Sequence, residues 1–339
     1  MKEFGWFAVI AGAVILEALT APGTALNGQG WKLSRSDSPG MVRFTVERSR
    51  PGSRTVTSSD VPLADFRGFT LDMLGHSGPA KFTYAEDAAD LQCEGKFSWG
   101  RGIGGFTLVP NAAFMSELSR LGFATPREDE LFQMVLTHIK LDFVREVRSA
   151  EIATSLRDLL DLAMHGVTSQ YIHDINRTGY RDLRAQDYIE MRDHGVEPRF
   201  IEELKQAGYQ LRTEQVIELK DHGVDSNYMR DLGAYDLHPS AGELVALRDH
   251  GVTPEFLRGF RDAGYGTIAA DQTIALKDHG VDRNFVMEAH DLGYRFTPDE
   301  LIQLHDHGVD GKYLRTIHDS GMRNLSADQI VQLREHGVE

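Results

Sequence analysis

A His-Gly-Val triplet recurs seven times between residues 165 and 338, and this period constrains the fold more than any other feature of the chain. Successive triplets are separated by 28 or 29 residues. A fixed period of this size is typical of solenoids, in which small helical units stack on one another. The histidine and glycine positions are His165 and Gly166, His194 and Gly195, His222 and Gly223, His250 and Gly251, His279 and Gly280, His307 and Gly308, and His336 and Gly337. We therefore predict an α-solenoid of seven helix-turn-helix repeats, each 28–29 residues long.

Each interval contains two amphipathic helical patterns. In the first helix an aromatic residue is followed directly by an aliphatic one and then by a third apolar residue, as in Tyr171, Ile172 and Ile175. This spacing places the three side chains on one helical face. The second helix carries a similar stripe, as in Leu244 and Leu247. The aromatic row is interpreted as core between units and not as a ligand-stacking groove.

The triplet itself is typical of a helix end. Glycine tolerates the left-handed conformation that the residue after a helix adopts, and an apolar residue after it packs back on the last turn. Leu304 and Val309 are such a pair around Gly308. Helix starts are marked by capping residues, for example Ser240 with Glu243 three residues later. Two units carry Glu151 or Asp236 where the first helix should end on glycine, and we expect looser or kinked turns there. Further predicted first-helix caps are Thr168, Asp225, Thr253, Asp282 and Asp310, and further capping boxes are Thr297 with Glu300 and Ser326 with Gln329.

The triplet histidine has a structural explanation, because a histidine at a helix C-terminus meets unpaired carbonyls and the negative end of the helix dipole. The acid directly before it is opposed by the same dipole. These acids are Asp193, Asp221, Asp249, Asp278, Asp306 and Glu335. We hypothesise that each acid accepts a hydrogen bond from a histidine, arginine or lysine of an adjacent unit. A solvated charged edge is the alternative.

No catalytic, cofactor-binding or metal-binding residue is predicted. Stacked helices lie about 8–10 Å apart, whereas zinc requires nitrogens at about 2 Å, so histidines of successive units cannot share one ion. The chain contains no HExxH motif. Two alternatives stay open, namely a metal-dependent hydrolase or metal-binding protein that uses histidine and aspartate of the repeat edge, and a pH-responsive structural protein.

The charge balance excludes one class of partner. The chain has 51 acidic and 36 basic residues, a net charge of −15. Binding to nucleic acid depends on concentrated lysine and arginine, so no nucleic-acid partner is expected. There is one cysteine, Cys93, so no intramolecular disulfide can form, and its alternation with Leu91 predicts that it is buried.

Residues 1–25 resemble an export signal, because an apolar run over residues 4–16 is too short for a membrane span. We predict a signal peptide or N-terminal anchor there. The protein is then periplasmic or secreted, or alternatively anchored in the inner membrane. Contact with a membrane is expected only if this segment stays uncleaved.

The remaining chain is predicted to be α+β and multidomain. Residues 26–110 form a β-rich domain, in which "MVRFTVERS" alternates apolar and polar residues as a half-buried strand does. The glycines of "WGRGIGGF" are interpreted as a hairpin connection, since no Lys-Ser or Lys-Thr pair and no helix follows them. Residues 111–140 are a helical connector, and residues 141–339 are the repeat array.

The segment "LRDHGVTPEFLRGFRDAGYGTI" resembles helical repeats of bacterial envelope proteins. Similar arrays follow the membrane part of metalloproteases of the beta-lactam-sensor regulator type. The segment "EDAADLQCEGKFSWGRGIGGFTLVPNAAFMSEL" resembles the β-rich region that accompanies those repeats. The protease part is absent here. The resemblance therefore implies an exported accessory or sensor-like module without transferable catalytic residues.

The expected function is non-catalytic binding of a protein or peptide along the array, because solenoids offer long surfaces. The printed chain stops at Glu339, directly after the last triplet. We expect self-association through an uncapped apolar end there as a further possibility.

Overall fold

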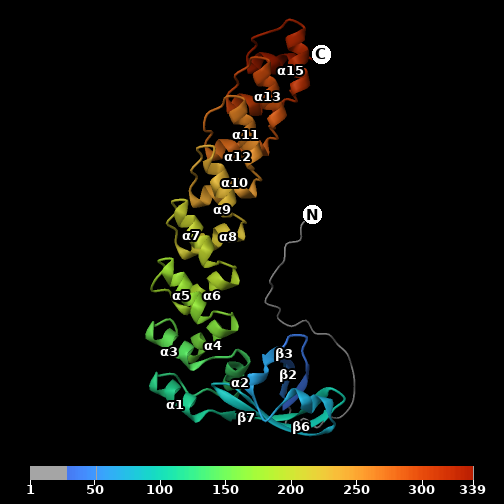
Figure 1. The fold of residues 1–339 in the computed structure, drawn as a ribbon. Helices are drawn as coiled ribbons and strands as arrows, with labels where there is room; N and C mark the ends of the chain where they lie inside the picture. The colour runs from blue at the N-terminus through green and yellow to red at the C-terminus, as the bar shows by residue number, and fades with distance from the viewer. Residues whose placement is uncertain (1–28, 51, 339) are drawn as a thin grey trace. The chain divides into compact units, whose positions relative to one another are not determined.

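The computed structural model describes residues 29–50 and 52–338, so the predicted signal or anchor at residues 1–25 lies outside the described part. The chain divides into two compact units, Met1–Ser169 and Gln170–Glu339. A β-rich region is followed by helices in a repeating arrangement, which is the predicted α+β organisation (Figure 1). Within the described residues, no helix combines the length and apolar character needed to cross a bilayer.

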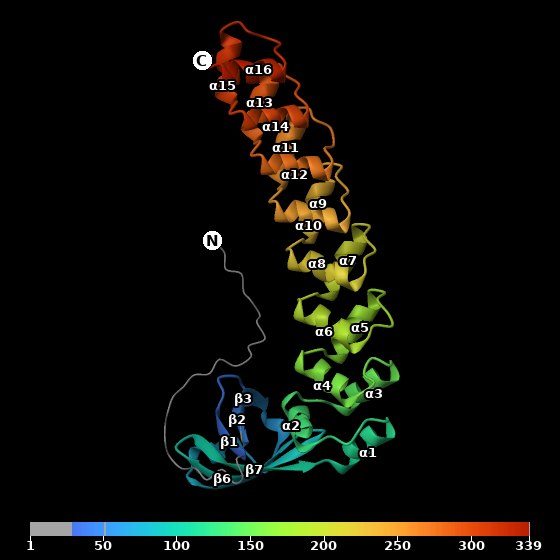
Figure 2. The same ribbon diagram turned by 180° about the vertical axis from the view of Figure 1, so that it is seen from behind.

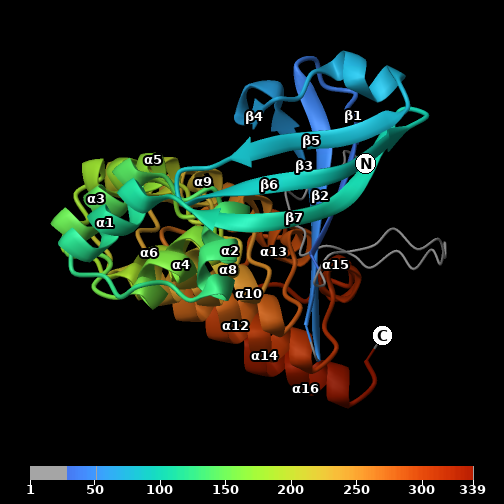
Figure 3. The same cartoon turned by 90° about the horizontal axis from the view of Figure 1, so that it is seen from below.

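The described N-terminal region is a seven-stranded antiparallel sheet in the order β3-β2-β1-β7-β6-β5-β4. The strands are β1 (Gln29–Arg35), β2 (Met41–Arg50), β3 (Ser53–Pro62), β4 (Phe66–Arg67), β5 (Gly78–Ala85), β6 (Ala89–Ser98) and β7 (Arg101–Pro110), with short 3-10 helices η2 (Leu63–Asp65) and η3 (Leu71–Gly75). Figure 3 shows β5, β6 and β7 running across the direction of β1, β2 and β3, so the sheet is strongly curled. This curl encloses the aromatic core on its concave side.

Alternation along the strands builds that core. Val42, Phe44 and Val46 of β2 are buried, as the sequence pattern predicts. Trp31 is 2% exposed, packs edge-on against Phe82 at 4.8 Å between ring centroids, and donates from Nε1 to the carbonyl of Gly105 at 2.9 Å. Cys93 of β6 is also buried, as the sequence predicts.

The glycine cluster has a different main role from the predicted one. Only Trp99 and Gly100 form the connection between β6 and β7, and both have positive φ (50° and 82°). The later glycines lie within β7. A Cβ at Gly104 would lie 2.0 Å from the carbonyl oxygen of Glu94, and one at Gly102 would lie 2.7 Å from the ring of Trp31. These glycines therefore let β6, β7 and the tryptophan approach closely.

Helices of similar length follow the sheet. They are α1 (Ala112–Arg120), α2 (Glu128–Leu136), α3 (Leu141–Ser149), α4 (Leu156–Met164), α5 (Ser169–Arg177), α6 (Ala185–Asp193), α7 (Pro198–Gln206), α8 (Thr213–Asp221), α9 (Ser226–Gly233), α10 (Ala241–Asp249), α11 (Pro254–Asp262), α12 (Ala270–Asp278), α13 (Arg283–Asp291), α14 (Pro298–Asp306), α15 (Gly311–Asp319) and α16 (Ala327–Glu335). Within the second unit, odd-numbered helices pack on odd-numbered ones and even on even (Figure 2). The aromatic–aliphatic stripe of the odd-numbered helices is buried, for example Tyr171, Ile172 and Ile175 of α5.

The triplet ends each even-numbered helix from α4 to α16. All seven triplet glycines have φ between 67° and 75°. The amide of each following valine donates to a carbonyl five residues earlier at 2.8–3.0 Å, as Val309 does to Leu304. The predicted caps Asp225, Thr253, Asp282 and Asp310 each accept a hydrogen bond from the amide three residues later. The capping box of Ser240 and Glu243 is also present.

The two turns that lack glycine close differently. Glu151 and Asp236 themselves adopt the left-handed conformation, with φ of 57° and 58°. After α3, the closing bond comes from Ala153 to Val147, one residue later than in the glycine turns. Helix α9 ends at Gly233 and is one residue shorter than the other odd-numbered helices from α3 to α15. A side chain in this conformation costs about 1–2 kcal/mol, so these turns are local departures from the repeat.

Candidate functional site

The triplet histidines and the acids form a regular row at the C-terminal ends of the even-numbered helices. In the second unit, the Nδ1 atoms of five triplet histidines lie 2.8–2.9 Å from a carboxylate oxygen of the next even-numbered helix. The pairs are His194 with Asp221, His222 with Asp249, His250 with Asp278, His279 with Asp306, and His307 with Glu335. We call these five pairs the histidine–acid row. The acid thus has the compensating contact that its position against the helix dipole requires.

The pairs of the row are exposed. The imidazoles are 40–45% exposed and the carboxylates 43–53%. Water screens exposed pairs of this kind, so they add little to stability. The hydrogen bond from His222 to Asp249 raises the pKa of His222 above its ordinary value. The row is therefore a chemically regular surface and contributes little to stability.

His165 is the C-cap residue of α4, and Asp193 is the last residue of α6. The last triplet histidine has a different contact from the histidines of the row. The Nδ1 atom of His336 lies 2.8 Å from the carbonyl oxygen of Gln332 in its own helix. This contact is the one expected of a histidine that caps a helix C-terminus.

A second row consists of cations that lie over aromatic rings, and it is not among the sequence predictions above. A basic residue two positions before the triplet histidine lies over the first aromatic residue of the preceding odd-numbered helix. The pairs are Arg192 over Tyr171, Lys220 over Phe200, Arg248 over Tyr228, Lys277 over Phe256, and Arg334 over Tyr313, at 4.8–5.4 Å. In α14, His305 occupies this position, 5.9 Å from the ring of Phe285. The constant spacing of the basic residue was the available signal, and it explains why the repeat reads Arg/Lys-Asp-His-Gly-Val.

Tyrosine hydroxyls link successive units at the other end of the even-numbered helices. Three tyrosines that each follow the glycine ending an odd-numbered helix donate to a backbone carbonyl directly before the N-cap of a later even-numbered helix. The pairs are Tyr180 with Leu211, Tyr209 with Pro239, and Tyr265 with Phe296. We call them the tyrosine contacts. Each one holds two neighbouring loops together. Tyr294 follows Gly293 in the same way, but its buried hydroxyl has no hydrogen-bond partner among the described residues.

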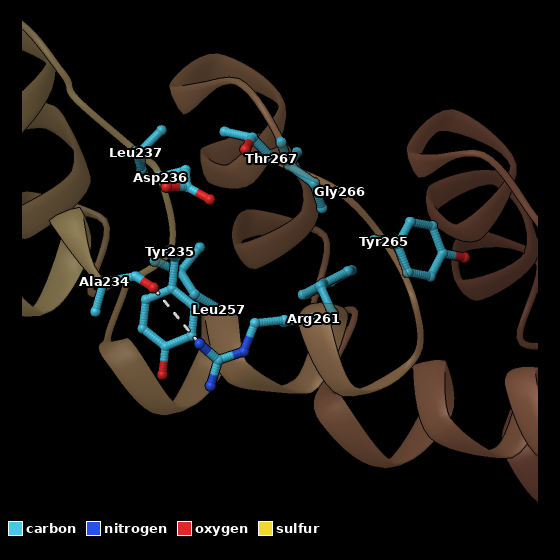
Figure 4. A pocket seen from close by; sticks show the side chains of 11 residues that line it. Ala234, Tyr235, Asp236, Leu237, Leu257, Arg261, Tyr265, Gly266 and Thr267 are labelled. Atoms are coloured by element: carbon cyan, nitrogen blue, oxygen red, sulfur yellow. Dashed lines mark hydrogen bonds between the residues drawn. The ribbon is translucent and has the colours of Figure 1, made fainter.

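A cavity of about 180 Å³ lies where this series is interrupted. In Figure 4, Asp236 and Leu237 face Gly266 and Thr267 across it. Tyr235 lies beneath, with its hydroxyl directed away from the Gly266–Thr267 loop. The guanidinium of Arg261 lies 4.5 Å from the centroid of the Tyr235 ring and donates to the carbonyl of Ala234 at 3.5 Å. The cavity therefore coincides with the departure at Asp236 that the sequence shows.

A wider hollow of about 400 Å³ occupies the equivalent place between earlier loops. It is lined by Gly179, Tyr180, Lys205, Gly208, Gln210 and Leu211. There the tyrosine contact to Leu211 is present, and the Nζ atom of Lys205 lies over the Tyr180 ring at 5.6 Å. The loops that precede the even-numbered helices thus border a hollow in more than one repeat.

A buried carboxylate in the first unit forms a separate cluster. The side chain of Glu86 is 2% exposed and accepts hydrogen bonds from Tyr84 (2.7 Å) and Lys140 (2.6 Å), and its Oε1 atom lies 2.7 Å from Nδ1 of His138. Burial alone would raise the pKa of Glu86, but the contacts with His138, Lys140 and Tyr84 lower it to about 2. Burial raises the pKa of Tyr84. No local motif indicates this cluster, because His138 and Lys140 are more than 50 residues from Glu86 in the chain.

Metal binding receives no geometric candidate. Within residues 29–50 and 52–338, no group of three or more histidine, cysteine, aspartate or glutamate side chains is placed to hold a metal ion.

No protein-family model matches the chain, and no curated protein matches its sequence. The resemblance to bacterial envelope repeats therefore stays a prediction.

Proposed function

We propose that helices α3 to α16 are seven repeats of a helix pair and serve as a non-catalytic scaffold that binds a protein or peptide. The observation that carries this proposal is the histidine–acid row, in which half-exposed pairs recur every 28 or 29 residues. Repeat arrays present such extended surfaces to partners without chemistry of their own. Because the pairs contribute little to stability, recognition is the role that explains their repetition.

The charge distribution supports a basic partner segment. Residues 170–339 contain 31 acidic and 19 basic residues, whereas residues 29–110 contain nine acidic and ten basic ones. The excess of negative charge is thus a property of the helical part. Electrostatic complementarity speeds association and excludes partners of like charge. The apolar run at residues 4–16 supports export, and we place the partner in a bacterial envelope.

A capture experiment tests the proposal. The full chain is immobilised and incubated with detergent-solubilised envelope, with and without EDTA, and retained proteins are identified by mass spectrometry. The triple variant Asp249→Asn, Asp278→Asn, Asp306→Asn removes three acids of the row. The matched control Glu202→Gln, Glu214→Gln, Glu255→Gln removes the same charge from exposed positions outside the row.

A dominant protein that the wild type and the control retain, and the row variant loses, supports the scaffold. Equal retention by the row variant would show that the row is not the binding surface. Loss of the partner in EDTA would favour the metal-dependent alternative instead.

A further inference from the structure

The series of tyrosine contacts is interrupted at Leu237. This residue follows the left-handed residue Asp236, as Tyr209 follows Gly208 one unit earlier. The acceptor in each tyrosine contact is the carbonyl directly before an N-cap, and the corresponding acceptor for position 237 belongs to Ile268, before the N-cap Ala269. A leucine cannot donate to it.

The helix that follows carries a matching change. Thr273 of α12 is 1% exposed, whereas the equivalent residues Leu244 and Leu301 of the neighbouring even-numbered helices are apolar. Its hydroxyl lies 2.9 Å from the carbonyl oxygen of Ala269 and 3.4 Å from that of Ile268. A hydroxyl has one proton, and the shorter contact takes it. The carbonyl of Ile268 therefore keeps capacity for a better donor.

The cavity next to this carbonyl is large enough for an aromatic ring, and its lining is mixed, with Asp236 and Arg261 beside apolar residues. Leu257, Phe260 and Ile268 contribute apolar surface, and the volume is about 180 Å³. An apolar cavity of about 150 Å³ is enough to hold benzene. Tyr235 does not take the place of the missing tyrosine, because its ring lies under Arg261 and its hydroxyl points away (Figure 4).

We propose that this cavity accepts a tyrosine side chain of a partner protein, with the hydroxyl donating to the carbonyl of Ile268 and the ring packing against Leu257 and Phe260. The partner then supplies the contact that Tyr180, Tyr209 and Tyr265 supply within the chain in other units. The site lies at the N-terminal ends of the even-numbered helices, whereas the histidine–acid row lies at their C-terminal ends. Tyrosine binding at this site is therefore a separate property from partner binding by the row, and each can be tested without the other.

Titration of the ¹⁵N-labelled full chain with p-cresol tests the site, with toluene as the comparison ligand. Saturable amide shifts centred on Thr267 and Ile268 are expected, with a dissociation constant in the millimolar range. The hydrogen bond should make p-cresol bind about fivefold more tightly than toluene. The capped peptide acetyl-Gly-Tyr-Gly-amide should perturb the same amides. Equal affinity for p-cresol and toluene, shifts of similar size at every loop, or no shifts with the peptide would overturn the proposal.

Two filled variants and one control sharpen the test. Leu237→Tyr supplies the missing side chain, and should raise the melting temperature and weaken p-cresol binding at least tenfold. Gly266→Phe adds a bulky side chain to a residue that lines the cavity, where no atom lies within 4 Å of an added Cβ, and should weaken binding even if Leu237→Tyr folds poorly. The control Tyr209→Phe removes a hydroxyl at an occupied position, and should leave p-cresol binding at Ile268 unchanged. Unchanged affinity in Gly266→Phe would show that the ligand binds elsewhere.

Discussion

Two groups of charged side chains in this protein use the same chemistry for different purposes. The carboxylate of Glu86 is 2% exposed and has three partners, Tyr84, His138 and Lys140. The carboxylates of the histidine–acid row are 43–53% exposed, and each is paired with one imidazole. Water screens the exposed pairs, whereas the buried group depends on its protein partners for all of its solvation.

The difference separates charges that the fold needs from charges that a partner can contact. A buried carboxylate that loses its partners destabilises the fold strongly, so its surroundings must stay intact. An exposed pair can be broken and re-formed at little cost, and a repeated series of such pairs presents a spaced pattern to a partner. Burial, more than the residue types, separates the two roles.

The largest effect is expected from Glu86→Ala. The substitution leaves Tyr84, His138 and Lys140 without their shared acceptor, and should destabilise the β-rich region by about 3 kcal/mol. Urea denaturation followed by tryptophan fluorescence measures this directly, because all tryptophans of the chain precede residue 100. Glu94→Ala is the control, since Glu94 is exposed and pairs only with exposed Lys81 among the described ion pairs. Similar midpoints for both variants would contradict the structural role of Glu86.

The same cluster predicts how stability depends on pH. The folded-state pKa of Glu86 is lowered to about 2, below the ordinary value of 4.5. Its contribution is therefore fully present above about pH 4.5 and is lost as the pH falls toward 2. The difference in urea midpoint between wild type and Glu86→Gln should shrink over that range. A difference that stays constant down to pH 2.5 would assign the stabilisation to packing instead of charge.

A smaller effect is expected at the helix ends of the array. Gly251 has φ of 68°, and Gly251→Ala should destabilise the helices by about 1 kcal/mol because a Cβ is strained in this conformation. Gly242→Ala is the matched control, since Gly242 lies within α10 and no atom lies within 4 Å of an added Cβ. Thermal unfolding followed by far-ultraviolet circular dichroism should show opposite shifts for the two variants. Equal shifts would mean that backbone conformation does not decide the effect.

The smallest effect is expected within the histidine–acid row. Asp249→Asn replaces the charged acceptor of His222 with a neutral one, which stabilises the imidazolium less, so the pKa of His222 should fall toward its ordinary value. Any stability from the pair is present below the ordinary histidine pKa and is lost as the pH rises through the raised one. An NMR titration of the His222 ring measures the pKa, and the unfolding midpoint should change less than in Gly251→Ala. An unchanged His222 titration would show that the pair does not form in solution.

The helix ends and the repeat were predictable because they depend on short-range contacts. The amide of Val309 reaches a carbonyl only five residues away, and the side chain of Ser240 accepts from the amide of Glu243, three residues away. The contact of His222 with Asp249 spans 27 residues, but the period brings equivalent positions of neighbouring units together. In a repeated sequence, contacts between equivalent positions of neighbouring repeats can therefore be predicted although they are distant in the chain.

Other features required the folded chain. Glu86 meets His138 and Lys140 only because the end of β5 and the residues after α2 come together in the first unit, and no period relates these positions. The sequence alone predicts a hairpin connection for the glycines of β7, because their close approach to Trp31 depends on how the strands pair.

Local sequence therefore determines where the helices of this protein begin and end, because capping bonds and left-handed glycines act within a few residues. It also determines the spacing of the row, because repeats of similar sequence and length stack in the same way. Tertiary packing alone decides that Glu86 is buried and that Leu237 borders a cavity. Solvation and unfilled volume are properties of the assembled surroundings, and no single segment of the sequence contains them.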